Sequence, residues 1–270
     1  MAFAIKRVGL IYKEPCQLSC SFCAIDKLDR TVKQTVDQFR AIILKLKKLG
    51  ITDIEQGPIL GDSLNDPNLE TKLLFCKEHN FTVELHTNLL NYSRLSKIID
   101  NADLSNTLSV SVSVYGQEDK EYLDVTGRDL YPSYGRQQQV LLRQLSKLKH
   151  VTFTVRTDML FKYDRLDRLP NVTVEYSLTS GNWGGNKPDQ VNPLPPTKEG
   201  ICGAVKYFTG IWPNGDVSFC GCHDIYEKHV VGNIFKDNIY GPGGRIANIT
   251  NSMEKNIYPK LCEGCDWFYD

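Results

Sequence analysis

The sequence predicts an α/β protein in which a partial (β/α)6 TIM barrel precedes a small C-terminal cysteine-rich domain with a β-hairpin. Three observations support this fold class. Six short apolar segments alternate with helical patterns, which is typical of parallel β/α units. An Asn-Gly pair at 214–215 separates two β-like segments, and this is a strong hairpin signal. The cysteines gather in two groups, one early in the chain and one late.

The expected elements follow from apolar spacing. Strand 8–12 leads into a cysteine loop and then into helix 36–49, which Gly50 terminates. The other strands are expected at 51–55, 81–85, 108–114, 151–155 and 172–176, and the other helices at 69–76, 91–100 and 140–148. Six strands are too few to close an eight-stranded barrel, so the barrel is partial. The loops after the strands build the active site in such barrels, and the cysteine loop follows the first strand.

Length and composition set the domain plan. A chain of 270 residues suits one large domain and a small appendage. We expect the barrel over 1–180, a Gly-, Asn- and Pro-rich linker or loop over 181–200 and the cysteine-rich domain over 201–270. Lys+Arg and Asp+Glu both number 32, so no net charge indicates nucleic acid or an anionic membrane as a partner. No targeting segment or spanning apolar run is visible, and we expect a cytoplasmic protein.

Cys16, Cys20 and Cys23 stand at C-x3-C-x2-C spacing. Three thiolates can hold one face of a [4Fe-4S] cluster and leave the fourth iron open to another ligand. A zinc site is disfavoured because structural zinc prefers four ligands and no histidine lies near this loop. Disulfides are disfavoured because the cytosol keeps thiols reduced.

This spacing resembles the signature of the radical S-adenosylmethionine (SAM) superfamily. The resemblance implies a [4Fe-4S] cluster whose open iron binds SAM, and cleavage of SAM to methionine and a 5′-deoxyadenosyl radical. It also implies that Phe22 packs beside the adenine, and that an external donor such as flavodoxin or ferredoxin supplies the electron.

Weaker motifs follow in the family's order. Gly61-Asp62-Ser63 resembles the GE-type motif that meets the SAM amino group, with Asp where Glu is usual. Thr87-Asn88 resembles the Thr-Asn-Gly tripeptide, with Leu89 in place of Gly. The resemblance implies further SAM contacts at Ser111, Ser113 and Arg156. Strand serines and strand-end arginines are also commonly structural, so both interpretations stay open.

The second cysteine group is Cys202, Cys220, Cys262 and Cys265. The hairpin of strands 205–211 and 216–219 should bring the first two together, while the other pair returns from the C-terminus. Four thiolates complete the ligand set of a second [4Fe-4S] cluster or of a zinc ribbon. These cysteines, with Pro213-Asn214-Gly215-Asp216-Val217 and Val231-Gly232-Asn233-Ile234, resemble the SPASM/twitch-type extension of radical SAM enzymes. The extension is similar in form to that of the 2-deoxy-scyllo-inosamine dehydrogenase type. This resemblance favours an iron-sulfur cluster over zinc.

Two cysteines remain. Cys222 is interpreted as idle, as a ligand or as a hydrogen-atom donor, and Cys76 as a core residue. In the long loop, Asn182 and Trp183 are candidate substrate contacts, although a turn over a packed aromatic explains them equally.

The resemblance leaves several functions open. We expect oxidation of a small polar substrate of the sugar or aminocyclitol type, with the auxiliary cluster accepting the electron. The alternatives are crosslinking or epimerisation of a ribosomally made peptide, and a non-catalytic metal scaffold. The predicted barrel begins close to Met1, so no separate leader-binding domain is expected. This favours a small molecule, or a peptide that a separate partner recognises.

Overall fold

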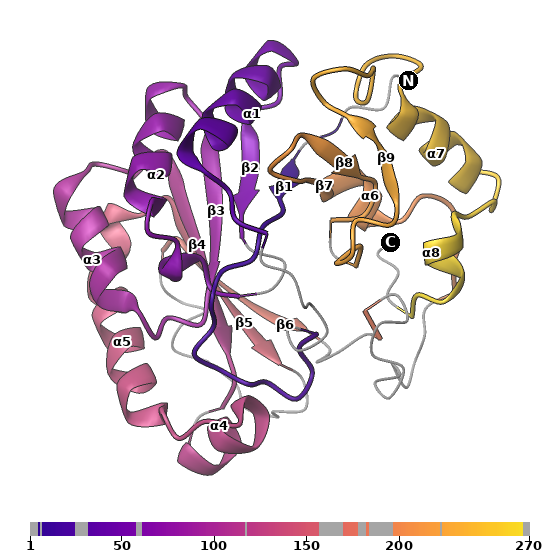
Figure 1. The fold of residues 1–270 in the computed structure, drawn as a ribbon. Coiled ribbons are helices and arrows are strands. Elements are labelled where there is room, and N and C mark those ends of the chain that lie inside the picture. The colour runs from indigo at the N-terminus through magenta and orange to yellow at the C-terminus, as the bar shows by residue number, and fades with distance from the viewer. Residues whose placement is uncertain are drawn as a thin grey trace. The chain divides into compact units, whose positions relative to one another are not determined.

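The computed structural model describes residues 5, 7–24, 32–57, 61–116, 118–156, 170–177, 182–183, 197–221 and 223–266, with backbone only at 131–134, 155–156, 176–177 and 207. The chain forms two compact units (Figure 1). We call Glu14–Cys23 with Leu60–Thr179 the loop unit. Met1–Lys13, Ala24–Ile59 and Ser180–Asp270 form the hairpin unit.

The loop unit is built on four parallel strands in the order β3, β4, β5 and β6. Their bounds are Thr82–Thr87, Leu108–Val114, His150–Arg156 and Val172–Ser177. Leu85 pairs with Val110, and Val110 pairs with Val151. All three side chains are at most 1% exposed, so this row of β-branched and leucine residues forms the centre of the core.

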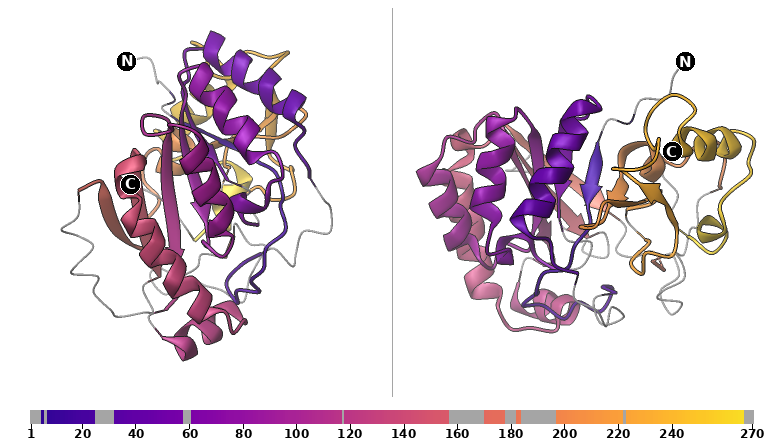
Figure 2. Two further views of the ribbon diagram at one scale, coloured as in Figure 1. Left: turned by 90° about the vertical axis from the view of Figure 1, so that its left-hand side faces the viewer. Right: turned by 45° about the horizontal axis from the view of Figure 1, so that its top comes forward.

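Helices follow the strands of the loop unit: α2 (Leu69–Glu78), α3 (Tyr92–Asn101), α4 (Asp119–Thr126) and α5 (Tyr131–Arg143), with short 3-10 turns η2 (Ser63–Asn65) and η3 (Leu145–Lys147). In α3, Leu95, Ile98 and Ile99 are buried at helical spacing. Figures 1 and 2 show α2, α3 and α5 side by side along β3 and β4. Helix α3 therefore packs through one apolar stripe.

The hairpin unit has β1 (Val8–Leu10) between β2 (Asp53–Gln56) and β7 (Thr209–Ile211), parallel to both. β8 (Asp216–Ser218) and β9 (Val230–Asn233) continue the sheet antiparallel. The turn between β7 and β8 contains Gly215 at φ +87°, which confirms the predicted hairpin. The helices are α1 (Val36–Lys48), α6 (Gly203–Tyr207), α7 (Arg245–Met253) and α8 (Lys260–Glu263).

Two predictions of local structure need correction, and one helix was not predicted. The strand expected over 205–211 is wrong in its first half, because α6 occupies those residues before β7 begins; a short apolar run fits one helical turn as well as a strand. The helix expected over 140–148 is shifted: α5 runs from Tyr131, where Pro132 suits a first turn, to Arg143, and a separate 3-10 turn follows at Leu145–Lys147. Helix α4 has no predicted counterpart, since few of its side chains are apolar; Gly127 ends it at φ +65°.

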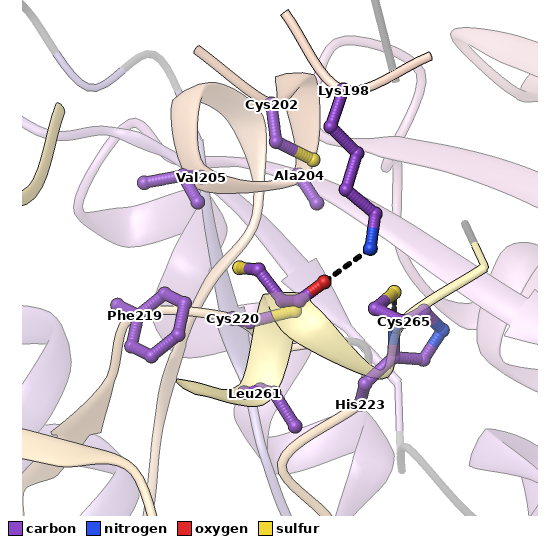
Figure 3. A pocket seen from close by; sticks show the side chains of 10 residues that line it. Lys198, Cys202, Ala204, Val205, Phe219, Cys220, His223, Leu261 and Cys265 are labelled. Atoms are coloured by element: carbon purple, nitrogen blue, oxygen red, sulfur yellow. Dashed lines mark hydrogen bonds between the residues drawn. The ribbon is translucent and has the colours of Figure 1, made fainter. Parts of the chain in front are cut away.

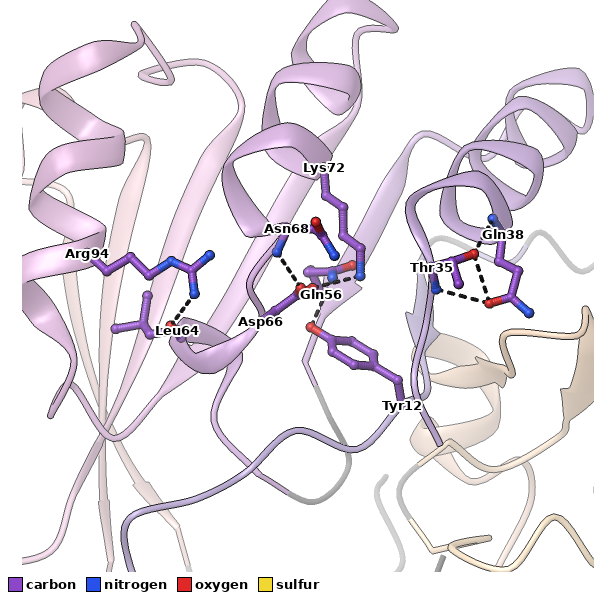
Figure 4. A network of polar contacts seen from close by, with 9 residues as sticks. All are labelled: Tyr12, Thr35, Gln38, Gln56, Leu64, Asp66, Asn68, Lys72 and Arg94. Atoms are coloured by element: carbon purple, nitrogen blue, oxygen red, sulfur yellow. Dashed lines mark hydrogen bonds and ion pairs between the residues drawn. The ribbon is translucent and has the colours of Figure 1, made fainter. Parts of the chain in front are cut away.

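Polar contacts hold the loops that follow the strands (Figure 4). In the loop unit, Lys72 and Asp66 form a buried ion pair at 2.7 Å, and Asp66 also accepts the backbone N–H of Asn68 at 2.8 Å. In the hairpin unit, the Gln56 amide donates to the Tyr12 hydroxyl at 2.9 Å. The bond from Asn68 helps to stabilise the buried pair, because a buried charge needs further hydrogen bonds.

The predicted α/β class is confirmed, since parallel strands and helices alternate and an antiparallel hairpin follows. The other predicted strands and helices are present with ends shifted by a few residues. The division into domains 1–180, 181–200 and 201–270 stays a prediction.

Candidate functional site

The cysteine loop of the loop unit is tied to α4. The backbone N–H of Ser19 donates to the carbonyl of Thr126 at 2.9 Å, and that of Ser21 donates to the carbonyl of Val125 at 3.2 Å. These bonds use carbonyl groups that the end of a helix leaves without helical partners. The loop's shape therefore depends on a helix that the sequence pattern did not reveal.

The cysteine loop carries three free thiols, and their role as cluster ligands stays a prediction. Cys16, Cys20 and Cys23 are half-buried and outside any disulfide, and the Cys16 Sγ accepts the backbone N–H of Leu18 and the side-chain amide of Asn88, each at 3.5 Å. Burial raises the pKa of Cys16, as does the nearby Asp62 charge, while these hydrogen bonds lower it. A cationic iron centre would remove this cost by stabilising the thiolate.

The Asp62 carboxylate fastens two loops of the loop unit. It is 1% exposed and accepts the Thr87 hydroxyl at 3.0 and 3.1 Å. It also accepts the backbone N–H of Asn88 at 2.5 Å and of Leu64 at 2.9 Å. Burial raises the pKa of Asp62 and the hydrogen bonds oppose that rise. Contact of this side chain with SAM stays a prediction.

An amide network joins the same loops to the cysteine loop. The Asn88 side chain donates to Gln17 at 3.4 Å as well as to Cys16, and Gln17 donates to Asn65 at 3.1 Å. Asn65 in turn donates to the carbonyl of Pro15 at 2.6 Å. Sequence reasoning missed Gln17 and Asn65, because an amide in a loop carries no signal until its partners are known.

Gly61 is required by a close backbone approach. Its φ is +127°, and a Cβ placed there would lie 2.1 Å from the carbonyl oxygen of Glu14. Its neighbour Ser63 is fully buried in η2. The Gly-Asp-Ser stretch is thus packed directly under the start of the cysteine loop.

Aromatic rings line the other side of the cysteine loop. The Phe22 ring stacks on Tyr115 with centroids 6.0 Å apart, and Tyr115 meets Tyr122 edge-on at 6.2 Å. Burial raises the pKa of Tyr122, and the charges of Cys20, Cys16 and Asp62 raise it further. Phe22 is half-buried, and its predicted contact with adenine stays a prediction.

Ser111 and Ser113 share one face of β4, as their spacing of two requires. The Ser111 hydroxyl lies 3.4 Å from that of Thr154 on β5. Arg156 ends β5 opposite Ser177, and its side chain lies outside the described residues. The backbone therefore places all three on adjacent strands.

The hairpin unit contains a pocket lined by all four cysteines of the second group (Figure 3). Its described lining residues are Lys198, Cys202, Ala204, Val205, Phe219, Cys220, His223, Leu261, Cys262 and Cys265. It measures about 380 Å³, including the space at its open mouth. The predicted convergence of these cysteines is confirmed, although Cys202 precedes α6 rather than a strand.

The electrostatics of the pocket fit a metal centre. Burial raises the pKa of Cys262 to about 12, and the charges of Cys220, Cys265 and Cys202 add to the rise. The four thiols line one pocket, which explains the contribution of the neighbouring cysteines to this pKa. A bound cation would stabilise these groups as thiolates, and four cysteine ligands suit a cubane cluster or tetrahedral zinc.

His223 is a pocket residue that the ligand predictions did not include. Its Nδ1 lies 3.4 Å from the Cys265 Sγ. Burial alone would lower the pKa of His223, but hydrogen bonds and charges from Cys220 and Cys265 raise it to about 10. The adjacent Asp224 uses its carboxylate to accept the Ser218 hydroxyl at 2.6 Å and two backbone N–H groups, so it caps a turn.

Asn182 and Trp183 lie against the C-terminal cysteine segment of the same unit. The Asn182 backbone donates to Asp266 at 2.7 Å and its side chain donates to the Gly264 carbonyl at 2.8 Å. The Trp183 ring meets His223 edge-on at 6.0 Å. Their predicted role as substrate contacts stays a prediction, and Cys222 lies outside the described residues.

Within the part of the chain described, no helix is long and apolar enough to cross a membrane.

No protein-family model and no curated protein matches the sequence. The structure is similar to that of BtrN in complex with AdoMet and 2-DOIA, with a TM-score of 0.63 at 14% identity, over 98% of this chain and 94% of that one. Streptococcus suis SuiB bound to precursor peptide SuiA gives a TM-score of 0.55 at 14% identity, over 98% of this chain and 70% of that one. Native anSMEcpe with bound AdoMet and Kp18Cys peptide gives a TM-score of 0.57 at 14% identity, over 93% of this chain and 83% of that one.

These similar structures are radical SAM enzymes with SPASM/twitch-type domains. The fold that the cysteine motifs imply is therefore confirmed. At these identities the likeness concerns the fold alone, and the chemistry depends on the residues of the two sites.

Proposed function

We propose that this chain is a radical SAM enzyme that oxidises a small polar substrate. The observation that carries the proposal is the pair of thiol sites: three cysteines on one loop beside Asp62 and Asn88, and four around the second pocket. When bound, a three-thiolate [4Fe-4S] cluster with SAM would supply a hydrogen-abstracting radical, and a fully ligated second cluster would supply an electron acceptor.

The residues of the loop unit have separate tasks in this proposal. Cys16, Cys20 and Cys23 would hold the catalytic cluster, and the Asn88 amide orients the Cys16 sulfur. The stacked rings of Phe22 and Tyr115 offer an apolar face for adenine. The remaining predicted SAM contacts are Gly61, Asp62, Ser63, Thr87, Asn88, Ser111, Ser113 and Arg156.

The likeness to BtrN supports a small substrate. BtrN is described with 2-DOIA, a small ligand, and this chain spans 94% of its length. SuiB and anSMEcpe are described with peptides, and this chain spans 70% and 83% of their lengths. A peptide substrate, crosslinked or epimerised, is the second candidate because two of the three similar structures contain one. An external reductant such as flavodoxin or ferredoxin would serve either reaction.

The test uses the full chain, reconstituted anaerobically with iron and sulfide and reduced with dithionite in the presence of SAM. We expect 5′-deoxyadenosine and methionine in equal amounts, and a substrate-dependent product two hydrogens lighter than its precursor. Candidate aminocyclitols and the short peptides encoded near the gene are tested in parallel. Absence of SAM cleavage by iron-loaded protein would refute the proposal and leave a metal scaffold.

A further inference from the structure

The second pocket has a polar side chain besides its cysteines that touches a thiol. The His223 Nδ1 is 3.4 Å from the Cys265 Sγ, and the residue is 5% exposed. Lys198, the other charged or polar lining residue described, directs its Nζ at the backbone carbonyls of Cys262 and Glu263 instead. Figure 3 shows the imidazole beside the Cys265 sulfur.

The imidazole is held in this orientation from two sides. On its own segment, the neighbouring Asp224 accepts the backbone N–H groups of Lys228 and His229 at 2.8 and 2.9 Å, which stiffens the turn. From a distant segment of the chain, the Trp183 ring meets the imidazole edge-on at an interplanar angle of 70°. Trp183 is itself positioned by the contacts of Asn182 with Gly264 and Asp266.

We propose that His223 is a positioning residue for the second metal centre: its Nδ1–H donates a hydrogen bond to the Cys265 thiolate and sets the centre's reduction potential. This inference rests on the proposed iron-sulfur cluster at Cys202, Cys220, Cys262 and Cys265. A metal-bound thiolate can only accept, and an imidazole has a ring N–H to give. Hydrogen bonds to ligand sulfurs stabilise the reduced, more negative state and so raise the potential.

The role of Trp183 follows from the same geometry. A hydrogen bond to sulfur is strongest where water is excluded, because the local dielectric is low. By packing against the imidazole, Trp183 would shield that bond from solvent. The segment 182–183 would thus help to set the reduction potential of the second cluster. This role does not depend on whether the segment also contacts substrate.

The experiment compares His223→Phe, which keeps a ring but removes the N–H, with His223→Asn, whose amide can still donate. Both are made in the full-length chain and in a Cys16→Ala/Cys20→Ala/Cys23→Ala background, which isolates the signal of the second centre. His79→Phe, at the end of α2 in the loop unit, is the matched control. The readouts are iron and zinc content, and the midpoint potential from a redox titration followed by electron paramagnetic resonance.

We expect His223→Phe to keep its iron while its reduction equilibrium weakens about tenfold, a fall of about 59 mV for one electron. His223→Asn should recover most of that shift, and His79→Phe should show none. An unchanged potential in His223→Phe, or loss of iron from both His223 variants, would overturn the positioning role while leaving the cluster intact in the native chain. Zinc instead of iron in the native chain would overturn the proposed function itself, and the inference with it.

Discussion

The Thr87 hydroxyl lies 3.0 and 3.1 Å from the two carboxylate oxygens of Asp62, although 25 residues separate the pair in the chain. The backbone N–H of Asn88 reaches the same carboxylate. The side chain of Asn88 then contacts the Cys16 sulfur. One buried acid therefore holds the residue that orients a candidate cluster ligand.

Replacement of Asp62 tests this arrangement. Asp62→Ala leaves two buried N–H groups without an acceptor, so we expect a loss of about 2 to 4 kcal/mol in the free energy of unfolding. If Asp62 also meets the SAM amino group, SAM binding weakens by about 1.5 to 3 kcal/mol while iron content is unchanged. Denaturant unfolding and equilibrium SAM binding measure the two effects.

Asp62→Asn removes the charge of this side chain and keeps one of its two acceptor oxygens. The N–H groups of Leu64 and Asn88 bond to different oxygens of the carboxylate. The single amide oxygen of Asn can replace only one of these acceptors, so we expect a loss of about 1 to 3 kcal/mol in the free energy of unfolding. SAM binding should still weaken, since the negative charge facing the ammonium is lost. Native SAM affinity in Asp62→Asn would assign this residue to loop fastening alone.

Gly61→Ala should strain the backbone where Gly61 packs against the start of the cysteine loop. The added Cβ would meet the Glu14 carbonyl oxygen at 2.1 Å, at a φ of +127° that side chains disfavour. We expect the free energy of unfolding to fall by about 2 to 5 kcal/mol from strain and overpacking. Gly135→Ala in α5 is the control: nothing lies within 4 Å of its Cβ, and stability should rise slightly. Equal effects of the two variants in urea unfolding would show that the close approach of Gly61 to Glu14 does not limit stability.

Metal content tests the two thiol sites. Two cubane clusters require about 8 Fe and 8 sulfide per reconstituted chain. The Cys16→Ala/Cys20→Ala/Cys23→Ala variant should keep about half of this iron and lose SAM cleavage, because only the second cluster remains. Elemental analysis of the native chain is decisive: one zinc with about four irons would identify the second centre as a zinc site.

Cys76 should be chemically inert. It lies in α2 at 1% exposure, and burial raises its pKa far above neutrality, so the thiol stays protonated. Iodoacetamide should alkylate the other cysteines of the iron-free folded chain before this one, as peptide mass mapping would show. Cys76→Ser should cost about 1 to 3 kcal/mol of stability without loss of iron. Early labelling of Cys76 would contradict its place in the core.

Cys222 separates oxidation from epimerisation. An oxidase exports an electron and needs no hydrogen donor, so Cys222→Ala should stay active and the product should be two hydrogens lighter. An epimerase that uses Cys222 would incorporate one solvent deuterium at the inverted carbon in deuterium oxide. We expect the first result, because the four converging thiols would hold a cluster that accepts the electron. A product that keeps the substrate's hydrogen count and carries one solvent deuterium would reverse this expectation.

The sequence by itself determined the features that depend on neighbours along the chain. The spacing of Cys16, Cys20 and Cys23 predicts the ligand set of the catalytic cluster, because all three lie on one short loop. Alternating apolar residues predicted β3 and β4, and Asn214-Gly215 predicted the hairpin, because turn geometry and strand periodicity are local properties. Even the position of Cys76 in the core follows from its leucine-rich helix.

Only the tertiary structure decided which polar side chains act together. The contact of Asn88 with Cys16 spans 72 residues and that of His223 with Cys265 spans 42. An Asn or His in a loop looks the same in sequence whether it faces water or a sulfur. Its partner depends on where distant loops meet after the strands have paired, which no local pattern encodes. The orientation of the thiol sites is therefore a property of the fold, and their existence a property of the sequence.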